Sequence, residues 1–383
     1  MSALPSSSVL SGKTVVGAVS ARINIDGREY LNFFGNGYLA LSQVPAIRAA
    51  VLEALKDGAP FAQQLPAALG GITPIFAAVE HAAALACAKE ASVYFASGYF
   101  LGMVGLASVD RSFNVLSLDE HAHPNLKDAA KLSGLQSHMF AHCDPGSLAD
   151  VLKISVGAGQ RPMVVTDGVF ASTGRIPPLS EYATILAPYN GRLFIDESHA
   201  LGVVGTNGRG AAEWCGVEHL AVTGSTLSKA FCAQGAVVGC SALDASRLRE
   251  IPAIRGACAG SPLSAVAATA SLAYVAQHPE LRENLLATTR YLRTRLRASG
   301  ITVIDSPAPI VSFQFGGRKD MQALQRRLFE EGIHIYHSTY FGAGPQGIIR
   351  CAVFRDHSRE DIDTLVSAIR RCGSAGSGSA GSG

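Results

Sequence analysis

Residues 193–199, with the sequence LFIDESH, change from apolar to polar, and our interpretation of the fold starts from this change. Three apolar residues precede an acid, Asp196, and His199 follows three residues later. A short apolar run that ends at a polar residue is typical of a buried strand that reaches the edge of a sheet. Ligands of α/β proteins bind at the carboxyl ends of such strands. Asp196 and His199 are therefore candidate site residues, although a helix cap and a structural histidine explain this stretch equally well when it is taken alone.

Short apolar runs of the same kind recur along the chain and alternate with segments of helical periodicity. Strands are expected at residues 92–96, 114–118, 163–166, 193–196, 221–224 and 236–240. Helices are expected between them at 75–89, 125–132, 148–155 and 180–186. This alternation predicts an α/β fold with a mainly parallel sheet.

The two ends of the chain have a different pattern. Residues 21–33, ARINIDGREYLNF, predict a β-hairpin that turns at Asp26-Gly27. A helical region at 263–298 precedes a smaller α+β unit, with strands at 310–315 and 348–354 and helices at 320–331 and 359–371. We therefore expect an N-terminal segment (1–44), a large domain (45–270), a small C-terminal domain (271–372) and a flexible Gly/Ser/Ala-rich linker (373–383).

The composition excludes several classes of function. The 383 residues are 48% hydrophobic and 16% charged, and 32 Lys and Arg residues nearly balance 30 Asp and Glu residues. A net charge of +2 does not favour nucleic acid or an anionic membrane as a partner. No apolar run reaches the ~20 residues of a membrane span. The eight cysteines form no CxxC pair, so we expect no metal site and a cytoplasmic protein with reduced thiols.

A second polar stretch, residues 223–229 with the sequence TGSTLSK, comes at another expected strand end. Small hydroxyl side chains and free backbone N–H groups suit a phosphate. Lys229 is the only lysine between positions 153 and 319. A lone lysine in apolar surroundings is costly to bury unless it is paired or forms a covalent bond. A lysine whose ammonium group reaches solvent is the simpler alternative.

Residues 95–99, FASGY, form a third such point, where a strand is expected to turn into a helix. Serine and glycine at that turn present N–H groups to an anion. Together the three stretches supply a phosphate-binding turn, an acid, a histidine and a lysine, and this set fits pyridoxal 5′-phosphate. The phosphate needs a helix N-terminus and hydroxyls, the pyridine nitrogen needs a carboxylate to stay protonated, and the aldehyde needs a lysine.

Seven motifs in order then give a family resemblance that covers about residues 30–371. The motifs are NFFGNGYLALS (32–42), FASGY (95–99), DEHAH (119–123), DGVFASTGRIPPL (167–179), IDESHALGVVGTNGRG (195–210), STLSKAF (225–231) and IIRCAVFRDHSREDID (348–363). As a set they resemble the α-oxoamine synthases, fold-type I pyridoxal phosphate enzymes that include 8-amino-7-oxononanoate synthase and serine palmitoyltransferase. The resemblance implies a large domain with a mainly parallel sheet and a smaller C-terminal α+β domain.

The resemblance also implies roles for individual residues. Lys229 is implied to bind the cofactor aldehyde and later to move the Cα proton of the amino acid, and Asp196 to pair with the pyridinium nitrogen. His199 is implied to hydrogen-bond the phenolic oxygen of the ring, and His121, in a His-Ala pattern, to stack on its face. The implied phosphate contacts are Ser97, Gly98, Tyr99 and Thr226.

Arg350, in the stretch IIRC, is implied to hold the carboxylate of an amino acid, with Asn36 as a further substrate contact. A surface arginine on a strand is the alternative. The implied reaction is a decarboxylative condensation of an amino acid with an acyl-CoA, which gives an α-aminoketone, CoA and CO2. The family further implies a homodimer with its active site at the interface. An aminotransferase and a non-catalytic partner subunit are the other hypotheses, and Lys229 counts against the second.

The chain departs from the usual family pattern at three single positions and in one loop, where residues 65–68, LPAA, replace the usual Gly-Ser-Arg or Gly-Ser-Gly. Phe76 stands where a histidine is usual, Ala171 where a serine is usual and Gly37 where an aspartate is usual. The missing histidine, the form DESH at 196–199 and Cys143-Asp144 are similar to the branch that makes quorum-sensing autoinducers. An autoinducer synthase is therefore one expectation. Residues 63–71 are expected to shape the choice of substrates.

Overall fold

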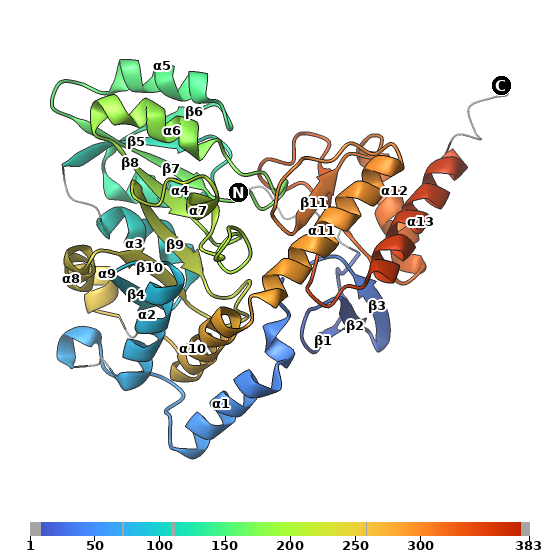
Figure 1. Cartoon of the computed structure of the whole chain (residues 1–383), viewed down its shortest axis with the longest axis horizontal. Helices are drawn as coiled ribbons and strands as arrows, with labels where there is room; N and C mark the ends of the chain where they lie inside the picture. The colour runs from blue at the N-terminus through green and yellow to red at the C-terminus, as the bar shows by residue number, and fades with distance from the viewer. Residues whose placement is uncertain (1–8, 71–72, 109–111, 258, 377–383) are drawn as a thin grey trace. The chain divides into compact units, whose positions relative to one another are not determined.

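The computed structural model describes residues 9–70, 73–108, 112–257 and 259–376, which form two compact units (Figure 1). The large unit comprises residues 41–170 and 175–282. The small unit comprises the residues up to Ala40, Ala171–Gly174 and the residues from Glu283 on. This division differs from the expected boundaries at 44 and 270, because the N-terminal hairpin pairs with a C-terminal strand inside the small unit.

The large unit is built on a seven-stranded sheet in the order β4-β10-β9-β8-β7-β5-β6. The five strands from β9 to β6 run parallel, and β10 runs antiparallel to both of its neighbours. The prediction of a mainly parallel sheet is therefore confirmed. The strands are β4 Ala91–Phe95, β5 Phe113–Asp119, β6 Gln136–Phe140, β7 Arg161–Asp167, β8 Arg192–Asp196, β9 Ala221–Thr226 and β10 Ala236–Cys240.

Helices flank this sheet, with α3 packed against β8, β9 and β10 and α2 packed against β4 and β10 (Figure 1). Gly105 allows α3 to approach closely, because a Cβ there would lie 2.0 Å from the ring of Phe194 on β8. The helices are α1 Pro45–Lys56, α2 Pro74–Ala86, α3 Leu101–Ser108, α4 Pro124–Ser133, α5 Pro145–Ser155, α6 Leu179–Leu186, α7 Ala211–Trp214, α8 Ala242–Glu250, α9 Pro252–Arg255 and α10 Pro262–Gln277.

The small unit contains two further sheets, in the orders β1-β2-β3-β12 and β11-β14-β13. The predicted hairpin is present, and Asp26 and Gly27 have the two positive φ angles, 50° and 82°, that a tight two-residue turn requires. The strands are β1 Val15–Val16, β2 Arg22–Ile25, β3 Arg28–Asn32, β11 Ile310–Phe313, β12 Ile333–His334, β13 Tyr336–Ser338 and β14 Ile348–Ala352.

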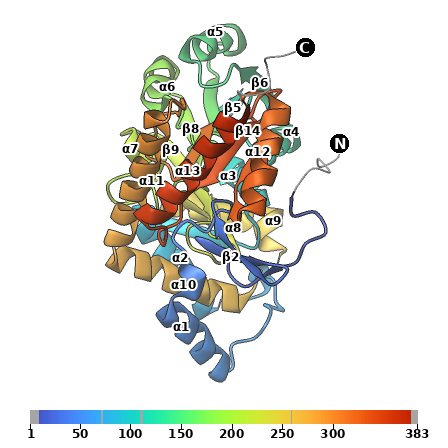
Figure 2. The same cartoon turned by 90° about the vertical axis from the view of Figure 1, so that its right-hand side faces the viewer.

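Three long helices complete the C-terminal part of the chain: α11 Glu280–Ala298, α12 Arg318–Glu330 and α13 Arg359–Gly376 (Figure 2). The expected helical region at 263–298 is two helices, because His278-Pro279 ends α10 before α11 begins. Helix α13 continues through the first four residues of the expected linker, whose remaining residues 377–383 lie outside the described residues. Over the part of the chain that is described, no helix is long and apolar enough to cross a membrane.

Candidate functional site

Three neighbouring parallel strands of the large unit end at one cavity of about 260 Å³. Asp167 is the last residue of β7, Asp196 of β8 and Thr226 of β9. Asp167 and Asp196 are direct partners in the β-ladder, and each is 5% exposed. The structure therefore places Asp196 at the sheet edge where α/β proteins bind their ligands.

This cavity brings together most of the cofactor contacts that the sequence predicts. The predicted residues in its lining are Ser97, Gly98, Tyr99, Asp196, Thr226 and Lys229. Residues that the sequence does not predict complete the lining: His123, Asn125, Asp167, Ser198 and Ser228. A lysine, two buried acids and several hydroxyls thus line one small cavity.

One side of the cavity has the features of an anion site. Ser97 caps a single 3₁₀ turn, Gly98–Phe100, which runs directly into α3, and its Oγ accepts the N–H of Tyr99 at 3.3 Å. The Oγ1 of Thr226 lies 2.7 Å from the Oγ of Ser228. A Cβ on Gly98 would lie 2.7 Å from the Cβ of Thr226, so the close approach requires glycine. A helix start lined by hydroxyls fits a phosphate group.

The two buried acids differ in their hydrogen bonds. Asp196 accepts the N–H of Ser198 at 2.9 Å and the side-chain amide of Asn125 at 3.4 Å. Asp167 accepts the N–H of His123 at 2.8 Å. Burial, together with the charge of neighbouring Asp196, raises the pKa of Asp167 well above its usual range. This shift favours the neutral acid form of Asp167. Asp196 is the acid that the sequence predicts beside a pyridinium nitrogen.

The histidine at this cavity is His123, two residues after the predicted His121. Its Nδ1 lies 2.8 Å from the Oδ1 of Asn125, and burial lowers its pKa, which favours a neutral ring. The ring of His121 instead packs on His142, with centroids 4.3 Å apart, and His121 is not part of the cavity lining. His199 is buried in the segment after β8 and is not part of the lining either.

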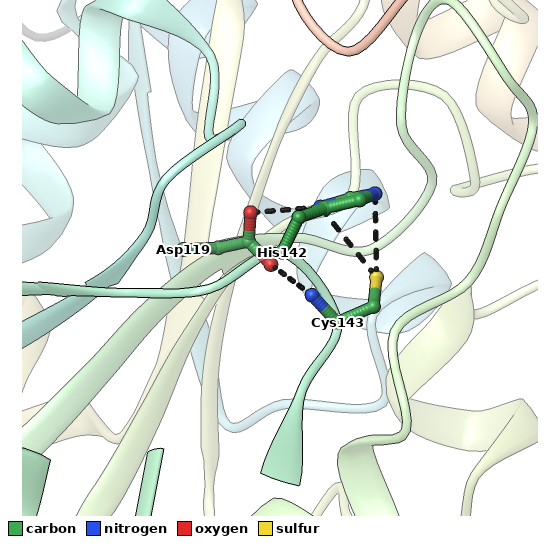
Figure 3. A group of neighbouring side chains, drawn as sticks. All are labelled: Asp119, His142 and Cys143. Atoms are coloured by element: carbon green, nitrogen blue, oxygen red, sulfur yellow. Dashed lines mark hydrogen bonds and ion pairs between the residues drawn. The ribbon is translucent and has the colours of Figure 1, made fainter. Parts of the chain in front are cut away.

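His142 belongs to a cluster with Asp119 and Cys143 (Figure 3). Asp119, at the end of β5, binds Nδ1 of His142 at 2.9 Å and accepts the backbone N–H groups of Cys143 and His121 at 2.9 and 2.8 Å. The Cys143 Sγ lies 3.5 Å from Nε2 of His142, and burial raises the pKa of this thiol to about 12. Because N–H donors occupy the carboxylate and the thiol stays protonated, the cluster ties together the loops after β5 and β6, and its chemistry does not suit a metal ion.

Arg350 and Asn36, the predicted substrate contacts, are neighbours in the small unit. Arg350 is 5% exposed, and its guanidinium donates to Asn36 Oδ1 at 2.9 Å and to the carbonyl oxygens of Ala171 and Gly35 at 2.7 and 3.3 Å. It also donates to the hydroxyl of Tyr38 at 3.4 Å, and burial raises the pKa of that phenol to about 12. The acceptors that the described residues give this cation are all neutral, so an anionic ligand can still stabilise its charge.

Ser172, which follows the departure at Ala171, does not take the place of the missing serine hydroxyl. Its Oγ donates to the carbonyl of Phe341 at 2.7 Å, and its own carbonyl accepts from Ser312 at 2.6 Å, all within the small unit. Its hydroxyl is therefore already engaged.

Comparison with known proteins shows the family of this chain. Residues 28–369 match the family described as aminotransferase class I and II. The 8-amino-7-oxononanoate synthase of Trichlorobacter lovleyi is 30% identical over 367 residues, which cover 92% of this chain and 91% of that protein. The corresponding enzyme of Lysinibacillus sphaericus is 28% identical over 357 residues, with coverage of 92% and 91%. The serine palmitoyltransferase of Sphingomonas wittichii shares the fold, with a TM-score of 0.86, 23% identity and coverage of 96% and 94%. The chain therefore belongs to the aminotransferase class I and II family and, within it, to the α-oxoamine synthases, which use pyridoxal 5′-phosphate.

Proposed function

We propose that this protein condenses an amino acid with an acyl-CoA and releases CoA and CO2 to give an α-aminoketone. The observation that carries the proposal is the position of Asp196, buried at the end of β8 in the same cavity as Lys229 and the anion-binding turn at Ser97. The bound cofactor supplies an electron sink for the negative charge that develops at Cα.

The residues of the cavity have separate roles in cofactor binding and proton transfer. Lys229 holds the cofactor aldehyde and moves the proton at the Cα of the amino acid. Asp196 keeps the ring nitrogen protonated through a charge that is shielded from water. We assign the stacking position to His123 instead of His121, because His123 lines the cavity and burial favours its neutral form. The contact predicted for His199 with the phenolic oxygen stays a prediction.

Arg350 is proposed to bind the amino-acid carboxylate, the group that leaves as CO2. Its buried guanidinium has only neutral acceptors among the described residues, and its planar fork matches a carboxylate with two hydrogen bonds. Asn36 accepts from the same guanidinium and keeps it oriented. Fixing the carboxylate also fixes the direction of the bond that breaks.

Release of free thiol tests the proposal. Purified protein with pyridoxal 5′-phosphate is incubated with a panel of acyl-CoAs against glycine, alanine, serine and 2-aminobutyrate, and thiol and CO2 are both measured. We expect at least one pair to release both in equal amounts and Lys229→Ala to release neither. Formation of a keto acid without thiol identifies an aminotransferase instead and overturns the proposal.

A cytoplasmic homodimer with the active site at its interface remains our proposal for the assembly. It is supported by the family and by large apolar side chains that are exposed near residues 61–69. Phe61, Leu65 and Leu69 are 77%, 54% and 70% exposed, and burial against a second copy removes this apolar surface from water. Sedimentation at micromolar concentration tests the assembly, and a monomer there contradicts it.

The autoinducer role rests on sequence features, of which the departure at Phe76 is one, and it stays a prediction. Its test is chemical: medium from cells that express the protein should contain the aminoketone product. Product that remains inside the cells contradicts a signalling role without affecting the proposed reaction.

A further inference from the structure

The large unit has a second cavity, of about 500 Å³, apart from the proposed cofactor site. Its walls come from Ala68, α2, the end of β4, the turn at Phe100, α3, α8, α9 and the residues after α9. The larger apolar side chains in its lining are Phe76, Tyr94, Phe95, Phe100, Met103, Val104 and Ile254. We propose that this cavity binds the aliphatic chain of the acyl thioester, an inference that rests on the proposed condensation reaction.

The charged side chains in the wall are already paired with one another. Arg249 donates to the two carboxylate oxygens of Glu80 at 3.1 and 2.7 Å, and Arg255 donates to Glu250 at 2.9 Å. Glu80 also accepts the backbone N–H of Tyr94 at 3.0 Å. Each charged group among the described lining residues thus has a partner of opposite sign in the same lining. A mostly apolar wall with neutralised charges favours a hydrocarbon over an ionic ligand.

One short turn forms part of the wall of both cavities. Ala96 and Phe100 line the second cavity, while Ser97, Gly98 and Tyr99, which lie between them, line the cofactor site. A substrate that reacts beside Lys229 can therefore lay its chain along residues 96–100 into the second cavity. This arrangement gives the turn two roles: it binds an anion on one side and hydrocarbon on the other.

The apolar cavity gives a physical reason for the departure from the family pattern at Phe76. The Phe76 side chain is 4% exposed, and its ring packs on Tyr94 with centroids 5.7 Å apart. The histidine that is usual here is more polar and suits a hydrocarbon less well than a phenyl ring. The cavity volume of about 500 Å³ is many times the ~30 Å³ that one molecule occupies in liquid water, so it has room for a chain of several methylene groups.

A chain-length series tests the inference. Straight acyl-CoAs from acetyl to stearoyl are assayed for thiol release with the best amino acid. In the wild type we expect kcat/KM to rise by up to about fourfold for each added methylene until the cavity is full. Met103→Trp adds bulk to the lining, so its profile should level off at a shorter chain than the wild-type profile does. Ala253→Phe fills the same cavity from α9, and we expect the same early plateau in its profile.

Leu243→Trp is the matched control, because Leu243 lies on α8, is 62% exposed and does not line the cavity. S-alkyl-CoA thioethers, which have no thioester to react, provide a second measurement by calorimetry. Their affinity should rise with chain length in the wild type and in Leu243→Trp, and level off early in the two filled variants.

Two results overturn the inference: thioether affinity that does not depend on chain length in the wild type, or the same early plateau in Leu243→Trp. A third result also overturns the inference: Met103→Trp changes the oligomeric state but leaves the chain-length profile unaltered. A second copy of the chain, and not the acyl chain, then covers this cavity. If no acyl-CoA releases thiol, the proposed reaction fails by itself, and thioether binding still decides what the cavity holds.

Discussion

Replacing Asp196 with asparagine removes the negative charge of the cofactor cavity and leaves the shape of the side chain nearly unchanged. The amide oxygen can still accept the N–H of Ser198, which lies 2.9 Å from Oδ1. Because Asp196 is only 5% exposed, little water is available to replace the lost charge. Loss of one preorganised electrostatic contact typically lowers kcat by about 10²-fold or more, or roughly 3 kcal/mol. We expect Asp196→Asn to lose turnover by this amount while it keeps most of its cofactor.

Asp167→Asn is the matched control, because Asp167 is the direct ladder partner of Asp196 and is equally buried. Burial and the charge of Asp196 raise the pKa of Asp167 well above its usual range, which favours the neutral acid form. An amide resembles that neutral form, and its oxygen can still accept the N–H of His123. We therefore expect turnover to fall by less than about tenfold, or ~1.4 kcal/mol.

The assay measures kcat of thiol release at saturating substrates and, separately, the amount of cofactor that each purified variant carries. Our reasoning requires a large kcat loss in Asp196→Asn, a small one in Asp167→Asn, and similar cofactor content in both. Near wild-type turnover in Asp196→Asn refutes the role of its charge. Equal losses in the two variants refute the assignment of that charge to Asp196.

Further predictions concern covalent binding, substrate binding and acid stability. Lys229→Ala should carry no cofactor mass after borohydride reduction and proteolysis, whereas the wild type should carry it on the Lys229 peptide; a labelled variant contradicts the assignment. Arg350→Lys keeps the charge but loses the fork, so KM for the amino acid should rise about 10- to 100-fold, or ~1.5–3 kcal/mol, with KM for acyl-CoA unchanged. The reverse pattern would move Arg350 to the thioester. Burial lowers the pKa values of His334 and His357 to about 4. Below pH 6.5 the unfolded chain binds protons that the folded chain rejects, so the free energy of unfolding should fall towards pH 4 by up to ~3 kcal/mol per histidine. Urea unfolding at several pH values checks this, and a His357→Asn variant with an unchanged pH slope contradicts it.

Local sequence predicts the elements of the large sheet that have two buried faces. The six predicted strands are short apolar runs, and all six are present. Strand β6, Gln136–Phe140, is not predicted, because it is an edge strand in which only Phe140 is buried, so its sequence contains no apolar run. The unit boundary also escapes prediction from sequence, because it depends on the pairing of β3 with β12, about 300 residues apart.

The choice between His121 and His123 shows which local signal determines the position of a site residue. The His-Ala pattern indicates His121, but Pro124 and Asn125 mark His123 as the N-cap of α4. A cap residue at the carboxyl end of a parallel strand lies where the chain turns over the ligand-binding edge. The backbone N–H of His123 accordingly reaches Asp167 at 2.8 Å, beside Asp196. The backbone N–H of His121 binds Asp119 instead, and that contact belongs to the Asp119–His142–Cys143 cluster. The position of the helix cap therefore predicts which histidine faces the cavity, because the cap position follows from backbone geometry. The His-Ala dipeptide says nothing about which way a side chain points.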